Sequence, residues 1–553
     1  MNYQEKQAFN KALTAWQDRD YTRVLNLLEK AKNAQALHLR GIAARRAGRL
    51  NMSKTSLERA LRLDTSNPEI NHNLALLQID RGEHDLALEL SKQALTLKPD
   101  WPNALRTQGR ILIALGRWPE ALHVYDKILD KNPDDTAACY GRANVWLEQG
   151  RAEDAAAEFD RLINSGMTDP ACLFMRGRAR QTLGQMKYAR ADFEQAMQLQ
   201  PRSMYLREAA RHLWTMNEHD AFQELVSKPY TDEALQVCAG DLLRQSGNFK
   251  QLVNTFSNPD QSPDALAILA WSALDQSQPN EALDFSQRAV QLNSNHANAR
   301  AAVISSLCAL GEATQAQQHI DHMRALEPHG QHWIAYQLAV WRLLDDERYK
   351  AWMDYQQLVQ SYELSTPDGY NSIEAFNAEF ESALLELHNH RCHPLDQSLR
   401  GGSQTRRDLQ LEQHPVIQAY LTALEKPIQD YLEHIGRNPE HPLSARNTGR
   451  YKLAGCWSVK LDGGGHHINH VHPEGWISSA YYVKVPPSNG DEKSGWIKFG
   501  EPAYPTEPPS AAEYSVEARA GRLVSFPSYL WHGTYPTSGT GLRLTAPFDI
   551  VPD

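Results

Sequence analysis

Four histidines lie within seven residues near the carboxyl end of the sequence, at His466, His467, His470 and His472. His470 and His472 are two positions apart, just before a β-rich run, and residues i and i+2 of an extended strand point to the same face. Two imidazoles on one face can ligate a metal ion, but a third ligand must come from elsewhere. His532, which follows another β-rich run, is the best candidate for it. The sequence therefore predicts a three-histidine metal centre.

An R-x-T pattern begins eleven residues after His532, at Arg543. Together with the H-x-H pair and the distal histidine, it resembles the Fe(II)/2-oxoglutarate oxygenases. Closer still is a bacterial branch of 2OG-Fe(II) oxygenases that is often carried behind tetratricopeptide repeats. The resemblance covers roughly residues 400–552, and its strongest pieces are SLRGGSQT (398–405), 470–486, GWIKFGEP (495–502) and 521–549.

The resemblance implies that His470, His472 and His532 hold Fe(II) and leave open positions for a cosubstrate and O2. Most oxygenases of this kind use two histidines and one carboxylate, and His472 stands where the carboxylate is usual. Asp462 and Glu474 are nearby carboxylates, but neither has the two-residue spacing to His470. We therefore expect three neutral ligands, which leave more positive charge on the metal.

The resemblance also implies a binding site for 2-oxoglutarate. Arg543 would pair with its distal carboxylate, because a guanidinium matches a carboxylate with two parallel hydrogen bonds. Thr545 lies on the same strand face and could donate a further bond. Tyr482 occupies the position from which a related group of prolyl hydroxylases reaches the same carboxylate, and Ser478 is expected beside it. Tyr481 points the other way by strand alternation.

Two other readings of the same residues stay open. The first is a cupin-type metalloenzyme with three histidines that does not use 2-oxoglutarate, because Gly464, His470, His472, Pro527 and His532 fit much of the cupin pattern. Arg543 has no role in that reading. The second is a non-catalytic adaptor, in which the repeats are a scaffold and the β-rich region is degenerate. Titration with 2-oxoglutarate distinguishes the first alternative from the oxygenase.

Three other segments near these residues have more ordinary interpretations. His466 and His467 are expected to be loop histidines or outer partners of the metal ligands, with contact to substrate as the alternative. The glycines of residues 463–465 predict a tight turn and not a phosphate cradle, because no helix follows them. Residues 400–405 are expected to form a loop near the mouth of the site.

The length and composition limit the class of protein. The chain has 553 residues, which suggests at least two domains. Lys plus Arg number 57 against 67 Asp plus Glu, and the net charge of −10 argues against a general binder of nucleic acid or anionic membranes. The six scattered cysteines form no C-x-x-C pair and are expected to be reduced thiols. With no apolar run of spanning length, a cytoplasmic protein without membrane association is expected.

The amino-terminal part of the sequence repeats with a constant period. Glycines recur every 34 residues at Gly48, Gly82, Gly116, Gly150 and Gly184. Alanines, large residues and prolines recur at the same interval, with Pro201 two intervals after Pro133. These residues are Ala87, Ala121, Ala155, Ala189; Tyr125, Phe159, Phe193; Pro99, Pro133, Pro201. This pattern resembles the tetratricopeptide repeat, a helix hairpin of about 34 residues. The glycine would lie in the turn, the alanine where the helices approach, and the proline at the end of the second helix.

We therefore expect residues 1–345 to form an α-solenoid of roughly eight to ten hairpins, whose groove binds a protein or peptide. Residues 346–553 would be the oxygenase domain, with a helical lead-in over 346–440 that contains helices at 372–388 and 415–432. Short β-like runs over 441–553 predict a jelly roll or small barrel, and the double-stranded β-helix of the oxygenases is such a fold. A repeat array fused to an oxygenase suggests hydroxylation of a protein or peptide, because the groove raises its local concentration.

Overall fold

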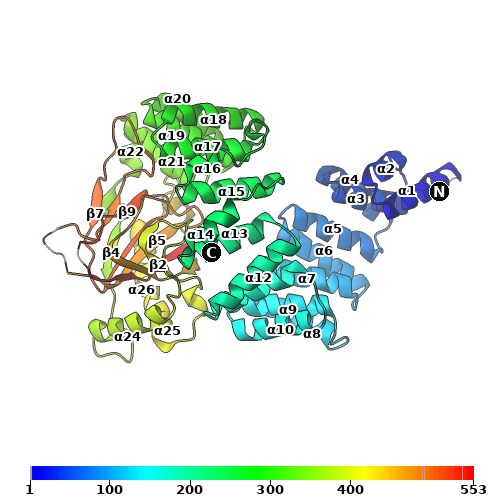
Figure 1. Ribbon diagram of the computed structural model, residues 1–553, viewed down its shortest axis with the longest axis horizontal. Coiled ribbons are helices and arrows are strands. Elements are labelled where there is room, and N and C mark those ends of the chain that lie inside the picture. The colour runs from blue at the N-terminus through cyan, green and yellow to red at the C-terminus, as the bar shows by residue number, and fades with distance from the viewer. Residues whose placement is uncertain (1–2, 488–489, 491, 539) are drawn as a thin grey trace. The chain divides into compact units, whose positions relative to one another are not determined.

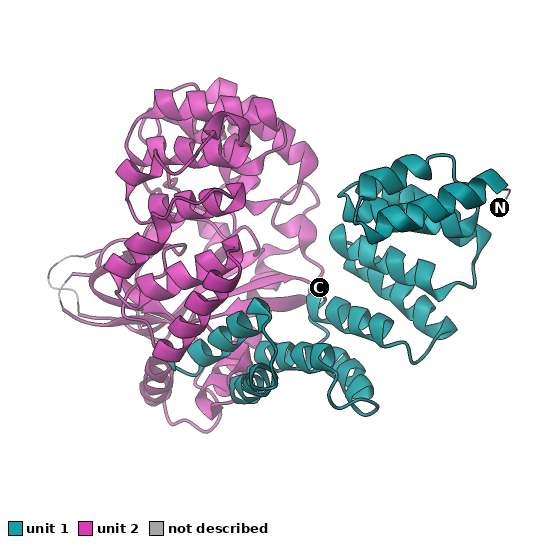
Figure 2. Cartoon of the chain, turned by 45° about the vertical axis from the view of Figure 1, so that its right-hand side comes forward, with its two compact units in different colours: residues 1–185 teal, residues 186–553 magenta. Residues whose placement is uncertain are grey.

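The computed structural model describes residues 3–487, 490, 492–538 and 540–553 (Figure 1). The chain divides into two compact units, residues 1–185 and 186–553 (Figure 2). Each unit is considered by itself. No helix among the described residues is both long enough and apolar enough to cross a lipid bilayer.

Unit 1 consists entirely of helix hairpins. Its helices are α1 (Tyr3–Gln17), α2 (Tyr21–Leu27), α3 (Ala34–Arg46), α4 (Leu50–Leu63), α5 (Pro68–Asp80), α6 (His84–Leu97), α7 (Pro102–Ala114), α8 (Trp118–Leu129), α9 (Thr136–Glu148), α10 (Ala152–Asn164) and α11 (Pro170–Thr182). Gly48, Gly82, Gly116 and Gly150 all have φ between +67° and +78°, the left-handed conformation that glycine adopts without strain. The hairpins predicted from the 34-residue period are thus confirmed, each turning at its glycine.

The alanines of the repeat mark where the helices come closest. Ala87, Ala121 and Ala155 of unit 1 are each 0% exposed. Tyr125 fills the space between neighbouring hairpins, and its ring lies so near Gly109 and Gly141 that an added Cβ would meet it at 2.5 and 2.3 Å. A side chain at either glycine would therefore displace the ring. Close packing between repeats, and not helix propensity alone, explains why these positions are small.

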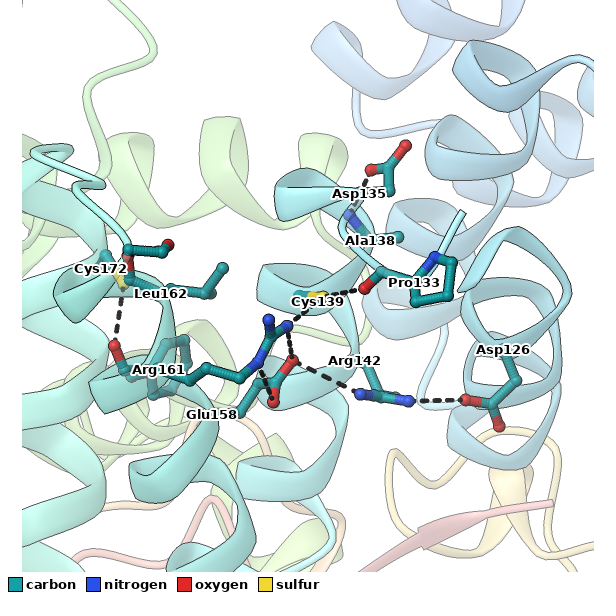
Figure 3. A network of polar contacts seen from close by, with 12 residues as sticks. Asp126, Pro133, Asp135, Ala138, Cys139, Arg142, Glu158, Arg161, Leu162 and Cys172 are labelled. Atoms are coloured by element: carbon teal, nitrogen blue, oxygen red, sulfur yellow. Dashed lines mark hydrogen bonds and ion pairs between the residues drawn. The ribbon is translucent and has the colours of Figure 1, made fainter. Parts of the chain in front are cut away.

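Polar contacts join adjacent helices of unit 1 around Cys139 (Figure 3). Arg161 donates from Nη2 to Glu158 at 2.9 Å and contacts the Cys139 sulfur at 2.8 Å. Arg142 lies between Glu158 and Asp126, 3.4 Å from an oxygen of each. Burial raises the pKa of the Cys139 thiol to about 11. Together these contacts connect α8, α9 and α10, and Cys139 stays a thiol.

Unit 2 begins with further helices of the same kind. They are α12 (Met186–Leu199), α13 (Ser203–Thr215), α14 (His219–Val226), α15 (Glu233–Gln245), α16 (Phe249–Leu252), η1 (Pro259–Gln261), α17 (Pro263–Asp275), α18 (Pro279–Leu292), α19 (Ala297–Ala309), α20 (Ala313–Leu326) and α21 (Gln331–Leu343). Ala189, Ala282 and Ala316 are each 0% exposed, as predicted for the repeat. The degenerate copies therefore fold as hairpins although their sequences are less regular.

A second set of elements follows the hairpins of unit 2. The helices are α22 (Glu347–Trp352), α23 (Tyr355–Leu358), α24 (Ile373–Glu386), η2 (Leu409–Leu411), α25 (Pro415–Ala423), α26 (Glu425–Ile435) and η3 (Ser444–Arg446). The strands are β1 (Gln360–Glu363), β2 (Leu399–Gln404), β3 (Tyr451–Cys456), β4 (Val459–His467), β5 (Ile477–Lys484), β6 (Ile497–Phe499), β7 (Tyr514–Val516), β8 (Arg522–Pro527), β9 (His532–Thr534), β10 (Arg543–Thr545) and β11 (Phe548–Pro552). Both lead-in helices predicted from the sequence are present, as α24 and as the pair α25–α26.

The strands form two antiparallel sheets. The larger sheet has the order β1-β8-β5-β10-β4-β2, with β11 pairing β3 and β5, and the smaller has the order β7-β6-β9. Their inner faces meet where the Phe499 ring of β6 packs on Phe526 of β8, with centroids 5.0 Å apart. On the outer face of the larger sheet, the Tyr481 ring lies 5.2 Å from that of Tyr420 and its hydroxyl donates to Asn377. The central strand β5 is thus covered on both faces, which accounts for its almost uninterrupted burial.

Three local predictions are wrong. Residues 400–405 were expected to be a loop, but Leu399–Gln404 form strand β2, which pairs with β4. The glycines of 463–465 lie within β4, and Gly464 takes φ +81° beside the register shift between the two strands. A sequence of glycines suggests a turn, but here the absence of side chains lets β2 and β4 approach closely, since a Cβ on Gly401 would lie 3.2 Å from Gly465. The His470–His472 segment is not a regular strand and pairs only through a single bridge to His532.

The last hairpins and the β region of unit 2 share one hydrophobic core, which runs from Ala301 to Ile550. At this seam Tyr336 of α21 stacks on Tyr504, and Trp531 donates its indole N–H to the carbonyl of Ala335. The division between compact units falls after Gln185. The expected boundary between a repeat domain and an oxygenase domain at 345/346 stays a prediction, and the shared core shows that these two parts pack as one body.

Candidate metal centre

The three histidines singled out in the sequence converge in the structure. The N–H of His470 donates to the carbonyl of His532 at 2.8 Å, and the N–H of His532 returns the bond at 3.0 Å. This pair of bonds joins the segment after β4 to the start of β9. The N–H of His472 donates to the carbonyl of Ser528 and holds the rest of the segment. One ligand atom of each of His470, His472 and His532 lies within 4.8 Å of the other two, a grouping able to hold a metal ion.

Hydrogen bonds on the far side of the rings orient the histidines. Nδ1 of His470 lies 2.9 Å from the carbonyl oxygen of Ile468, and Nδ1 of His532 lies 2.8 Å from that of Leu530. Because a carbonyl only accepts, each Nδ1 carries the proton and Nε2 keeps its lone pair. Burial, followed by the proximity of the His472 ring, lowers the pKa of His470 to about 3. Burial also holds the pKa of His532 well below its usual value, so both rings are neutral and able to ligate.

Asp549 of β11 lies directly behind His472. Both of its carboxylate oxygens are 2.8 Å from Nδ1 of His472, and Nε2 of that ring lies 3.2 Å from Nε2 of His470. Oxygenases of the kind described above usually have one carboxylate among the metal ligands. Here the carboxylate of Asp549 is instead bonded to a ring nitrogen of His472. Such an outer carboxylate fixes the tautomer and raises the basicity of the ligating nitrogen. The sequence analysis missed Asp549, whose only signal was an acidic residue between Phe548 and Ile550 in an apolar strand.

The two carboxylates weighed in the sequence analysis have no contact with the three histidines. Asp462 lies on β4 with its side chain in solvent, 3.8 Å from Lys460. Glu474 lies at the mouth of the cavity described below. Neither belongs to the group of side chains able to hold a metal among the described residues. The three histidines are thus the candidate ligands that the structure brings together, and none of them is a carboxylate.

Arg543 of β10 is buried and has no acidic partner among the described residues. The residue is 2% exposed, and its guanidinium lies 5.0 Å from the centre of the Tyr482 ring. Its Nε and Nη1, and the hydroxyl of Tyr482, have no hydrogen-bond partner within the described part of the chain. A buried charge left unpaired costs several kcal/mol, roughly 3–5 in ion pairs that lose one partner. Arg543 therefore stands ready for an anion that is not part of the protein.

The other residues expected at the cosubstrate site lie close by but differ in what they touch. Thr545 lines the same cavity as Arg543, with its hydroxyl 3.5 Å from the carbonyl oxygen of Val459. Ser478 does not line the cavity. Its hydroxyl lies 3.0 Å from Nδ1 of His472 and 2.8 Å from the hydroxyl of Ser528. This position suits an orienting partner of His472 better than a ligand of 2-oxoglutarate.

A single cavity of about 850 Å³ connects the three histidines with Arg543 and Thr545. His470, His472, His532 and Arg543 all line it, together with apolar side chains such as Ile497 and Phe526. Further residues of its wall come from three other parts of unit 2: Arg244, Gln245, Gly247, Phe249 and Asp275 from α15 to α17; Leu395, Asp396, Gln397, Ser398, Arg400 and Gln404 around β2; and Val471, Pro473 and Glu474 after the ligands. The segment expected at the mouth of the site thus does border the cavity, and so do helices of the repeat array.

His467 belongs to the site and His466 lies at its edge. His467 lines the cavity, and its ring stacks beside that of His470 with centroids 5.9 Å apart. Burial, followed by the proximity of His470, holds the pKa of His467 well below its usual value. His466 has only a 3.4 Å contact between its Nδ1 and the carbonyl of Gly464. Of the two roles considered for this pair, the outer-partner role fits His467.

Family models match both parts of the chain. Residues 455–549 match the model described as "Putative 2OG-Fe(II) oxygenase". Residues 38–102, 106–170 and 170–203 match models of the tetratricopeptide repeat. The chain therefore carries tetratricopeptide repeats in its amino-terminal part and a region of the 2OG-Fe(II) oxygenase type at its carboxyl end, as the sequence pattern predicted.

Proteins and solved structures similar to this chain each match part of it. The chain is 29% identical over 98 residues to the photosystem I assembly protein Ycf3 of Prochlorococcus marinus, covering 17% of this chain and 57% of that one. It thus spans little more than half the length of the curated relatives it matches. A thermophilic tetratricopeptide-repeat protein of Thermus thermophilus covers 33% of this chain and 99% of its own, with 21% identity and a TM-score of 0.30. A repeat protein of Parabacteroides merdae covers 50% and 98%, with 15% identity and a TM-score of 0.33.

Proposed function

We propose that the β region of unit 2 is an Fe(II)- and 2-oxoglutarate-dependent dioxygenase that hydroxylates a side chain of a protein or peptide. The observation that carries this proposal is the buried guanidinium of Arg543, whose Nε and Nη1 have no partner among the described residues, in the same cavity as three histidines. A metal ligand set and a cation facing one cavity suit a dicarboxylate that binds metal at one end and arginine at the other. A cupin-type metalloenzyme that ignores 2-oxoglutarate would leave Arg543 without a function.

The histidines fit Fe(II) in number and chemistry. Three imidazoles with their Nδ1 atoms engaged present three Nε2 lone pairs to one point and leave the remaining positions open. Imidazole ligands carry no negative charge, so the full charge of a divalent ion would remain to attract an anionic cosubstrate. Fe(II) and 2-oxoglutarate, when bound here with O2, would supply oxidative decarboxylation coupled to hydroxylation of a C–H bond. The protein itself supplies no nucleophile and acts by positioning these reactants.

Arg543 and its surroundings would hold the other end of the cosubstrate. The Tyr482 ring packs against the guanidinium and would hold it in position, although Tyr482 does not itself line the cavity. Thr545 is two residues from Arg543 on the same strand face and also lines the cavity. Ile497 and Phe526 make part of the wall apolar, which restricts water and strengthens a charge-assisted pair.

The cavity wall contributed by the repeat array supports a polypeptide substrate. Residues of α15, α16 and α17 face the same space as the metal ligands. A target bound along the hairpins would thus reach the reaction centre without leaving the array, and tethering of this kind raises its effective concentration. Tetratricopeptide arrays commonly bind proteins through an extended surface of this sort.

The decisive experiment is titration of 2-oxoglutarate into anaerobic, Fe(II)-loaded full-length protein, followed by the metal-to-ligand charge-transfer band. Arg543→Ala should weaken 2-oxoglutarate binding by roughly 30-fold or more, because losing a buried charge-assisted pair costs about 2–5 kcal/mol. Affinity for Fe(II) should hardly change, since Arg543 is not a ligand. His532→Ala should instead lose the metal.

Arg522→Ala is the matched control for the arginine. Arg522 lies on β8 of the same sheet, but it pairs with Glu363 and Glu517 outside the cavity. Its removal should leave 2-oxoglutarate binding unchanged. If the wild-type protein binds Fe(II) but not 2-oxoglutarate, the cosubstrate assignment fails and the cupin reading gains. Equal binding by wild type and Arg543→Ala would show that the role given to Arg543 is wrong.

A further inference from the structure

Ser398 lies at the metal centre although it is far from the histidines in sequence. It immediately precedes β2, and its carbonyl accepts the N–H of Ile468 at 2.9 Å. Its hydroxyl oxygen lies 3.2 Å from Nε2 of His470, the nitrogen whose lone pair is free for a metal. It also lies 2.8 Å from Nδ1 of His467, and both Ser398 and His467 line the cavity. The backbone bond thus fixes a hydroxyl beside a metal-binding atom.

The distances around His470 place this hydroxyl like a neighbouring ligand atom. Nε2 of His472 and Oγ of Ser398 are each 3.2 Å from Nε2 of His470. Adjacent donor atoms around a six-coordinate ion with bonds of about 2.1 Å are about 3 Å apart. Ser398 is therefore as near to Nε2 of His470 as the second histidine ligand is. A metal held by the three histidines would bring an oxygen ligand in one of its open positions next to this hydroxyl.

We propose that Ser398 and His467 form a hydrogen-bonded pair that positions the oxygen ligand in one open coordination position of the metal. This inference rests on the proposed metal site, but not on the identity of the cosubstrate. When His470 binds metal, its Nε2 no longer accepts a bond from the Ser398 hydroxyl. A neutral His467 with its proton on Nδ1 donates to Oγ of Ser398, and the serine O–H is then donated to the metal-bound oxygen. A water or a carboxylate oxygen would be recognised alike.

Replacement of the hydroxyl by a thiol tests the position without any assay of activity. Ser398→Cys in the full-length protein is loaded with Co(II), and the absorption spectrum is compared with that of wild type. A sulfur that reaches the open position binds as a thiolate, so we expect a near-ultraviolet thiolate-to-cobalt charge-transfer band and Co(II) affinity raised about 10-fold or more. Circular dichroism verifies that the variant is folded.

Ser403→Cys is the matched control, because Ser403 is also bonded to a histidine nitrogen, at 2.8 Å from Nδ1 of His388, on the same strand segment. It should bind Co(II) like wild type and show no such band. If Ser398→Cys binds Co(II) through the histidines but shows no charge-transfer band, Ser398 is not within reach of the open position and the inference is overturned. A wild-type protein that binds no Co(II) would instead overturn the metal site itself.

Ser398→Ala gives a second measurement should the cysteine variant misfold. Loss of one hydrogen bond to a charged ligand should weaken 2-oxoglutarate binding to the Fe(II)-loaded protein by about 3- to 10-fold, with Fe(II) affinity nearly unchanged. Ser403→Ala is again the control. Unchanged 2-oxoglutarate affinity in Ser398→Ala, with normal binding by wild type, would refute the role of Ser398 and leave the proposed function standing.

Discussion

At the scale of single residues, we expect the candidate metal centre to depend on the carboxylate of Asp549, which contacts a histidine ring and would not bind the metal itself. Asp549 contacts Nδ1 of His472 with both oxygens, while His470 and His532 have only carbonyl oxygens at the equivalent nitrogen. His472 is thus the one ligand of the three with an anionic partner. In many such sites a carboxylate binds the metal directly, whereas here the carboxylate of Asp549 is bonded to the imidazole of His472.

Asp549→Asn should lower the affinity for Fe(II) or Co(II) by about 10- to 100-fold, the usual effect of removing an outer partner of a histidine ligand. An amide can still accept a hydrogen bond but carries no charge, so His472 becomes a weaker base. Competition with a chelator measures the affinity. Asp462→Asn, which changes an exposed carboxylate of β4, is the control and should bind normally. Equal affinity in both variants would show that the Asp549 charge does not act on the metal.

At the scale of elements, a buried histidine ties the lead-in helix to the sheet. His388 follows the end of α24, and its two ring nitrogens lie 2.8 Å from the hydroxyl of Ser403 and 3.1 Å from that of Ser458. Ser403 belongs to β2, the strand whose start carries Ser398, and Ser458 precedes β4. Burial, followed by the charge of Lys460, lowers the pKa of His388 to about 4. A neutral imidazole thus joins the end of α24 to Ser403 and Ser458.

This lowered pKa predicts acid sensitivity of the fold. The unfolded chain takes up the proton of this histidine near the ordinary histidine pKa of 6.5, whereas the folded protein resists protonation down to about 4. The stabilisation is therefore complete above that unfolded value and is lost as the pH falls between the two. His388→Gln, which keeps a hydrogen-bonding side chain without a titrating group, should reduce the loss by about 1–3 kcal/mol.

Urea unfolding at several pH values between about 7 and 4 measures this effect through the linkage of stability to proton uptake. The exposed His329 provides the control, because His329→Gln should keep the wild-type slope of unfolding free energy against pH. A His388→Gln protein whose stability falls as steeply as that of wild type would show that other buried histidines account for the acid sensitivity. His212 and His390, whose pKa values burial also lowers to about 4, would then be examined next.

At the scale of the whole molecule, the repeats of unit 2 are part of the proposed active site. Arg244 of α15 and Asp275 at the end of α17 form an ion pair at 2.9 Å in the cavity wall, and Phe249 of α16 lies in the same wall. Burial raises the pKa of Asp275, although 37% of its side chain stays exposed to solvent. The array would then select the substrate at the reaction centre as well as recruit it.

Arg244→Ala should reduce the hydroxylation of cellular protein targets by about 10-fold or more, because substrate positioning is lost. Binding of Fe(II) and 2-oxoglutarate should stay normal. Mass spectrometry of cells that express wild type or variant would detect target peptides by the mass of one added oxygen. Arg288→Ala is the control, since Arg288 pairs with Asp260 and Asp284 and does not line the cavity. The same peptides at the same level with Arg244→Ala would exclude this wall from substrate selection.

Local patterns in the sequence were sufficient for most of the architecture. A period of 34 residues determines the hairpins, because turn glycines and buried alanines depend on neighbours within one repeat. The i, i+2 spacing of His470 and His472, and the β-rich runs before His532 and Arg543, likewise depend on adjacent residues. The two glycines in residues 400–405 favour a loop when the sequence alone is considered. In the structure the same glycines allow this segment to pair closely with β4.

The contacts that complete the site were decided only by the tertiary structure. Asp549 reaches His472 across 77 residues, and Ser398 reaches His470 across 72. Only the folded chain shows that Nε and Nη1 of Arg543 have no partner among the described residues. Likewise, only the folded chain brings residues of α15 to α17 into the wall around the histidines. Such contacts have no fixed spacing, because they depend on how the sheets close and not on the geometry of one strand or helix. Residue types and spacing therefore determined which ligands are present, whereas the folded chain decided what surrounds them.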